Sequence, residues 1–256
     1  MSIFQSKKKQ RELYEKLIKL TLIGAATISI LTTFGILFSI LFEAIEFFKV
    51  RSFWYFMTGT VWSPGVIDSQ FGALPIFAGT FIITIIALSV AIPVGLGSAI
   101  YMSEYASSKL RDYLKPILEV LAGIPSVVYG FFAAITVAPF VVQVAQVFGI
   151  EATFNSALAS GIVMGIMIIP TISSLSDDVI RSVPDSQRKA AFGLGMTHGE
   201  TIKDIVIPTA MPGIISASLL ALSKALGETM VVVMAAGLRP NLSWNPLEDM
   251  TTVTVS

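Results

Sequence analysis

The sequence predicts an all-α protein, a polytopic bundle of transmembrane helices. Composition is the first reason: of 256 residues, 54% are apolar and only 13% are charged, whereas average soluble domains carry about a quarter charged residues. The mean hydropathy of +0.78 is the second reason. The third is that the apolar residues gather into five long runs, four of them uncharged, and a helix needs about 20 apolar residues to cross roughly 30 Å of hydrocarbon.

The same composition excludes several classes of protein. Seventeen Lys and Arg balance 17 Asp and Glu, so the surplus of basic charge that marks a nucleic-acid binder is missing and no nucleic-acid partner is expected. With no cysteine and one histidine, His198, we expect no metal site and no cofactor. The motifs of zinc proteases, serine hydrolases and ATP-binding loops are also missing, so we expect no catalytic residues and no enzyme activity.

The first run covers 20–42 and predicts one membrane-spanning helix between a cytoplasmic segment, 1–19, and an extracytoplasmic loop, 43–73. The remaining residues, 74–256, form the predicted core. Its four helices are expected, in order, at Leu74 to Tyr101, between Glu119 and Glu151 with interruptions at Pro125 and Pro139, at Phe154 to Leu175, and at Pro212 to Leu238.

Basic residues predict the orientation of these helices. Thirteen of the 17 Lys and Arg lie before the first helix, between the second and third, or between the fourth and fifth. Lys and Arg are enriched in cytoplasmic loops. We therefore expect a cytoplasmic N-terminus and a cytoplasmic loop at 177–212.

That loop is too regular in sequence to be a simple connection. Asp185 is predicted to cap a short helix that Gly195 ends, and a second short helix follows and stops at Pro208. Two readings stay open at this point: a projection that docks a soluble partner, or an amphipathic hairpin on lipid headgroups. His198 is expected to be solvated or at an interface, and the pair Asp177 and Asp178 to mark the exit from the membrane.

The spacing within the loop resembles a known signature. Lys189-Ala190-Ala191, then Gly195, then nine residues and Ile205-x-Ile207-Pro208 resemble the E-A-A-x3-G-x9-I-x-L-P signature of ATP-binding-cassette importer permeases, with Lys189 in place of Glu. The resemblance implies that 185–208 docks on a separate ATP-binding subunit in the cytoplasm. The coupling residues it implies are Lys189, Ala190, Ala191, Gly195, Ile205 and Pro208.

Two further fragments, 123–130 (GIPSVVYG) and 223–230 (SKALGETM), resemble segments of phosphate importer permeases. That family implies a type I permease fold that ends with a sixth helix, which is expected to be missing here. It also implies import of inorganic phosphate across the bacterial inner membrane by alternating access. The partners it implies are a second permease subunit in a heterodimer, ATP-binding subunits, an extracytoplasmic phosphate-binding protein and membrane lipid. Import of molybdate or sulfate, and a passive anion channel, are the alternatives.

Two charges within the fifth run predict the substrate pathway. Lys224 and Glu228 are four residues apart, which places them on one face of a helix. An isolated charge in a bilayer costs about 2.5 to 3.5 kcal/mol on insertion scales, so such residues are seldom placed there without a function. We predict that Lys224 meets the anion as a point charge where the family usually has Arg. The alternative is a pair that locks this helix to a neighbour.

Overall fold

A computed structural model describes residues 2–65 and 69–256, with side chains from Tyr14 onward. It consists of two compact units, Met1–Phe56 and Met57–Ser256. In the first, α1 is a single helix over Ser2–Val50. It extends beyond the predicted span 20–42 at both ends because no proline or glycine interrupts the flanking charged segments. α2 (Phe53–Thr58) begins after a short turn in which aromatic rings pack edge to face, such as those of Phe48 and Phe53 at 5.3 Å.

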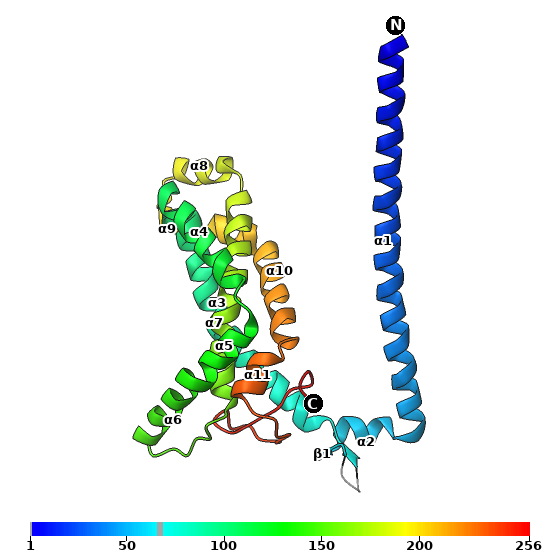
Figure 1. Cartoon of the computed structure of the whole chain (residues 1–256). Helices are drawn as coiled ribbons and strands as arrows, with labels where there is room; N and C mark the ends of the chain where they lie inside the picture. The colour runs from blue at the N-terminus through cyan, green and yellow to red at the C-terminus, as the bar shows by residue number, and fades with distance from the viewer. Residues whose placement is uncertain (1, 66–68) are drawn as a thin grey trace. The chain divides into compact units, whose positions relative to one another are not determined.

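The second unit opens with a two-stranded antiparallel sheet, β1 (Trp62–Ser63) and β2 (Gln70–Phe71). All that follows is helical or irregular (Figure 1). The helices are α3 (Leu74–Ile100), η1 (Tyr101–Tyr105), α4 (Ser108–Ala122), α5 (Ser126–Phe132), η2 (Ala133–Val137), α6 (Ala138–Val147), α7 (Ala157–Ser182), α8 (Asp185–Gly193), α9 (His198–Thr201), η3 (Ile202–Val206), α10 (Ile207–Leu226) and α11 (Met230–Ala235). The three η segments are π-helical.

Within the described residues, five helical stretches are long and apolar enough to cross a membrane, which confirms the predicted fold class. They are Tyr14–Val50, Leu74–Tyr105, Ser126–Val147, Ala157–Ser182 and His198–Leu226. One segment that was expected to be a loop is a helix instead. α4 occupies most of the space between the second and third runs, and packs beside α7.

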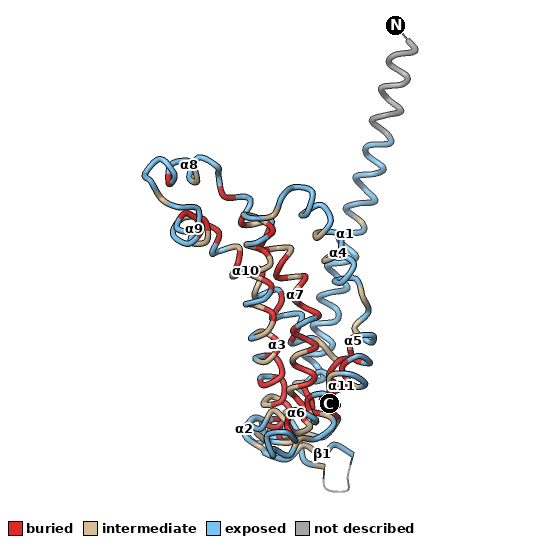
Figure 2. The backbone as a smooth tube through the Cα atoms, turned by 90° about the vertical axis from the view of Figure 1, so that its left-hand side faces the viewer, coloured by how far each residue is buried: buried red, intermediate tan, exposed pale blue. Residues whose placement is uncertain are grey.

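The core of the second unit lies between α3 and α7, which pack along their length (Figure 2). Small residues make this close packing possible. A Cβ atom at Gly161 would lie 2.6 Å from Ile86 Cγ2, and one at Gly165 would lie 2.8 Å from the carbonyl oxygen of Ala87. Around them, Ile83, Ile168 and their neighbours are fully buried.

Two of the three prolines that are predicted to interrupt or end a helix do not do so, while Pro125 does separate α4 from α5 as predicted. Pro139 lies in the first turn of α6 and Pro208 in the first turn of α10, and each follows a π-helical segment. A proline ring clashes with the carbonyl four residues earlier. Those carbonyls belong to Ile135 and Asp204, inside the wider π turns, so the helix passes through both prolines. The prediction that Pro208 ends the second loop helix is therefore wrong.

Candidate functional site

The predicted coupling loop forms one end of the second unit, opposite α6 (Figure 1). α8 and α9 are joined at Gly195, whose φ of +84° lies in the left-handed region that glycine adopts without strain. α9 begins with a capping box: Thr197 Oγ1 accepts from the backbone N–H of Glu200 at 3.3 Å, and a carboxylate oxygen of Glu200 accepts from the N–H of Thr197 at 2.7 Å. Local sequence thus fixes the turn.

The start of α8 differs from the prediction. Pro184, not Asp185, is the N-cap residue, and it makes no side-chain cap; Asp185 instead lies in the first helical turn. Pro184 has the extended backbone typical of an N-cap residue, with φ −60° and ψ 136°. Asp185 still favours the helix through its negative charge at the N-terminus.

The coupling residues do not share one surface. Lys189, Ala190, Gly195 and Pro208 are exposed, and Ile205 is half-buried. Ala191, in contrast, is buried on the side of α8 that faces the bundle. Beside Gly195, the apolar side chain of Leu194 is 85% exposed. The tip of the loop therefore presents small and apolar groups, while Ala191 anchors α8.

Three ion pairs near this end join residues far apart in the sequence. Arg111 of α4 holds Asp177 of α7 at 2.6 Å, where the aspartate side chain is 1% exposed. Lys115 holds Asp178 at 2.6 Å, and Arg188 of α8 holds Glu104 at 2.8 Å. The hydrogen bond and the charge of Asp177 raise the pKa of Arg111 against the opposing effect of burial. Sequence reasoning missed these pairs because no local spacing relates the partners.

Lys224 and Glu228 do not lie on one helix, so that prediction is wrong. α10 ends at Leu226, and Gly227 weakens its continuation. Glu228 Oε1 accepts from the N–H groups of Met230 at 3.0 Å and Val231 at 3.3 Å, which caps α11. The side chain of Lys224 is exposed on α10 and has no hydrogen bond or ion pair with any described residue.

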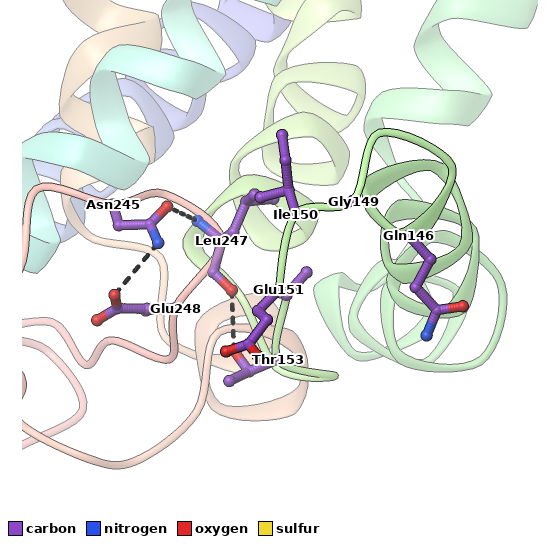
Figure 3. Close-up of a pocket in the computed structure, with 9 residues that line it drawn as sticks. Gln146, Gly149, Ile150, Glu151, Thr153, Asn245, Leu247 and Glu248 are labelled. Carbon is purple, nitrogen blue, oxygen red and sulfur yellow. Dashed lines mark hydrogen bonds between the residues drawn. The ribbon is translucent and has the colours of Figure 1, made fainter.

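A further cavity lies between the end of α6, the segment 149–153 that follows it and the segment 245–248 (Figure 3). Its volume is about 630 Å³, and its walls include Glu151, Thr153 and Glu248. Glu248 accepts hydrogen bonds from Asn241 at 2.8 Å and Asn245 at 3.2 Å. Hydrogen bonds from Ser243, Asn241 and Asn245 lower the pKa of Glu248. No predicted site residue lines this cavity.

Comparison with known proteins gives consistent relatives. The chain is 38% identical over 199 residues to the "Probable ABC transporter permease protein YqgH" of Bacillus subtilis, covering 78% of this chain. It is 34% identical over 212 residues, 72% of this chain, to the "Phosphate transport system permease protein PstC 1" of Mycobacterium bovis. The chain spans 63% of the length of both relatives. A solved inward-facing structure of the MetNI methionine ABC transporter aligns with a TM-score of 0.49 and 20% identity, over 65% of this chain and 74% of that one.

A family model supplies the assignment. The model described as "Binding-protein-dependent transport system inner membrane component" matches residues 91–243. The match starts within α3 and ends beyond α11, so it includes both the loop between α7 and α10 and Lys224. The chain therefore belongs to the family of inner membrane components of binding-protein-dependent transport systems.

Proposed function

We propose that this chain is the permease subunit of an ATP-driven importer of inorganic phosphate, and that it moves phosphate by alternating access. One observation carries the proposal: a short two-helix loop with the spacing of the importer signature stands at one end of a membrane bundle whose relatives include named phosphate permeases. The chain supplies a path and a docking surface, and a separate subunit hydrolyses ATP.

The loop 185–208 serves in this proposal as the contact with the cytoplasmic ATP-binding subunit. Its tip is suited to close approach because Ala190, Leu194 and Gly195 are exposed and small or apolar. Lys189 is exposed next to them, so it presents a positive charge where the family signature has a negative one. Ile205 of η3 and Pro208 at the start of α10 belong to the far arm of the loop.

Lys224 supports the proposed pathway. It lies within the membrane-spanning stretch His198–Leu226, is exposed, and has no partner among the described residues. A cation in this position is costly if it faces lipid. A second permease subunit on this face of α10 would remove Lys224 from lipid and place it where an anion passes. Glu228 then has two roles, as the cap of α11 and as a negative charge four residues after Lys224 in the chain.

The remaining partners follow from the same proposal. We place the N-terminus and the loop 185–208 in the cytoplasm, the second permease subunit beside α10 as a heterodimer, and an extracytoplasmic phosphate-binding protein at the opposite end. Lipid surrounds the outer helices. Orientation is tested with a single cysteine at Thr197, since the chain has none of its own. An impermeant thiol reagent should label it only after cells are opened, and labelling of intact cells would contradict the orientation.

Phosphate uptake tests the pathway. Lys224→Gln should abolish uptake of labelled phosphate in cells that lack other phosphate importers, whereas Lys224→Arg should retain it because the charge remains. Glu228→Gln separates the two roles of Glu228, since an amide oxygen can still cap α11 while the charge is lost. Lys109→Gln, the same change at an exposed lysine of α4, is the matched control and should transport normally.

Two results would contradict the proposal. If Lys224→Gln takes up phosphate at the parental rate, Lys224 has no role in the pathway. If this variant no longer binds the ATP-binding subunit, the role of Lys224 is structural. If the unaltered transporter takes up sulfate or molybdate in preference to phosphate, the proposal that phosphate is the substrate is refuted.

A further inference from the structure

Both arms of the loop between α7 and α10 reach the same point, the π-helical end of α3. From α8, an Nη atom of Arg188 donates to Glu104 Oε1 at 2.8 Å. From α9, the ring of His198 packs edge-on against Tyr105 with centroids 5.1 Å apart, and its Nε2 lies 3.9 Å from Glu104 Oε2. The ring of Phe192 also stacks on this imidazole, with centroids 6.2 Å apart.

Arg188 connects three helices through one guanidinium group. Besides Glu104 at the end of α3, it donates to the carbonyl oxygens of Ile180, at 2.9 Å, and Val183. The last carbonyls of a helix have no partner within it, so Arg188 completes the C-terminus of α7. The side chains of Arg188 and Glu104 are only 16% and 6% exposed. A planar group with five donors can hold all three acceptors at once, which an ammonium group cannot do with the same geometry.

Few other contacts tie α8 to the bundle, and one of them is a hydrogen bond from Thr209 Oγ1 of α10 to Gln187 Oε1 at 3.3 Å. Among the nine residues of α8, all of them described, only Ala191 is buried, and its methyl group offers little area. The fourth contact of Arg188, to Asp185 within α8, is longer at 3.5 Å and involves an aspartate that is 82% exposed. The guanidinium is thus the main polar link between α8 and the helices α3 and α7.

We infer that Arg188 is a positioning residue that transmits movement of α8 to α3 and α7, and so couples ATP hydrolysis to transport. The inference rests on the proposed function, in which an ATP-binding subunit pushes and pulls this loop. Two neighbouring basic residues then have different contacts. Lys189 is exposed and available to the ATP-binding subunit that docks, whereas Arg188 points inward, toward α3 and α7. Without the inward link, α8 can move with the docked subunit while α3 and α7 stay in place.

The test uses the complete transporter, with the full-length permease, reconstituted in proteoliposomes. Phosphate transported and ATP hydrolysed are measured in the same sample, and their ratio is the readout. Arg188→Gln and Glu104→Gln should each lower this ratio at least tenfold while ATP hydrolysis stays within twofold and the ATP-binding subunit still co-purifies. The double variant should be no worse than either single one because both changes break one link.

Arg188→Lys and Lys109→Gln complete the design. The lysine keeps a positive charge beside Glu104 but loses the simultaneous bonds to two carbonyls, so we expect an intermediate ratio. Lys109→Gln removes an exposed positive charge of α4, outside the loop 185–208, and is the matched control, with the parental ratio expected. A merely structural role would lower assembly and ATP hydrolysis together and leave the ratio of transport to hydrolysis unchanged.

The inference and the proposed function fail in different ways. If the unaltered transporter moves no phosphate with ATP, the proposed function is refuted. If it does, and Arg188→Gln keeps the parental ratio, the inference is refuted while the proposed function stands. Additive losses in the double variant, or loss of the ATP-binding subunit from Arg188→Gln, would also overturn it, because Arg188 would then act apart from Glu104 or at the docking surface.

Discussion

The ion pair between Arg111 and Asp177 should contribute more to stability than the neighbouring pair between Lys115 and Asp178. Both have contacts of 2.6 Å, but Asp177 is 1% exposed and Asp178 is 53% exposed. Removing one partner of a buried pair leaves an uncompensated charge and costs about 3 to 5 kcal/mol. Because Arg111 is 19% exposed and lies 3.9 Å from Asp178, we expect Asp177→Asn to cost about 3 kcal/mol, at the lower limit of that range. Asp178→Asn, at a solvated pair, should cost less than about 1 kcal/mol.

Thermal unfolding of the detergent-purified protein measures the difference. For a chain of this size, about 1 kcal/mol corresponds to roughly 2 to 4 °C in Tm, so we expect a fall of about 6 to 12 °C for Asp177→Asn and less than about 4 °C for Asp178→Asn. Adding Arg111→Gln to Asp177→Asn should cost less than the sum of the single changes, since the unpaired cation disappears. Equal shifts for the two aspartate variants would refute the argument that burial decides the contribution.

Three further changes test other parts of the structure. Gly195→Ala should cost about 1 to 2 kcal/mol because its φ is positive, whereas Gly193→Ala, in α8, should be neutral or stabilising; equal melting temperatures would contradict this. Gly165→Ala should cost about 1 to 3 kcal/mol because its new methyl group meets a backbone carbonyl at 2.8 Å, and a parental melting temperature would show that α3 and α7 can separate freely. Since hydrogen bonds lower the pKa of Glu248 from 4.5, its stabilisation of the loop is complete above that pH and is lost as the pH falls through the lower folded value. Trp244 fluorescence in a protein without its other tryptophans should report that change, and Glu248→Gln should not show it.

Local sequence was sufficient for the elements that depend on local physics. Five membrane-spanning stretches follow from runs of apolar residues, since the bilayer sets their length. The turn at Gly195 could also be predicted because it depends on one glycine and on the capping residues Thr197 and Glu200. The spacing around Ala190 identified the loop, although not which of its residues face outward.

Contacts between distant segments could not be predicted in this way. Asp177 is separated from Arg111 by 66 residues, and Glu104 from Arg188 by 84, so no periodicity connects them. The break after Leu226 was missed because the predicted run, Pro212 to Leu238, is apolar on both sides of it apart from the short segment that holds Lys224 and Glu228. Two structures are possible at this point: a continuous helix, or a break in which the side chain of Glu228 accepts hydrogen bonds from the backbone at the start of α11. The local sequence does not decide between them, because the choice depends on packing against other helices.

The π-helical segment η3 sets the rotational position of everything that follows it in α10. It is closed by a hydrogen bond from the N–H of Ile207 to the carbonyl of Ile202, five residues earlier, so it holds one residue more than an α-helical turn. The wider turn absorbs the extra residue, because each of its residues rotates the chain by less than the roughly 100° of an α-helix. Deleting one residue of η3 would therefore restore the α-helical repeat and leave Lys224 close to its present rotational position. A deletion further along α10 has no wider turn to absorb it and would rotate Lys224 by about 100°, away from the exposed face. The place of a deletion thus decides which surface carries the charge, with no substitution at Lys224 itself.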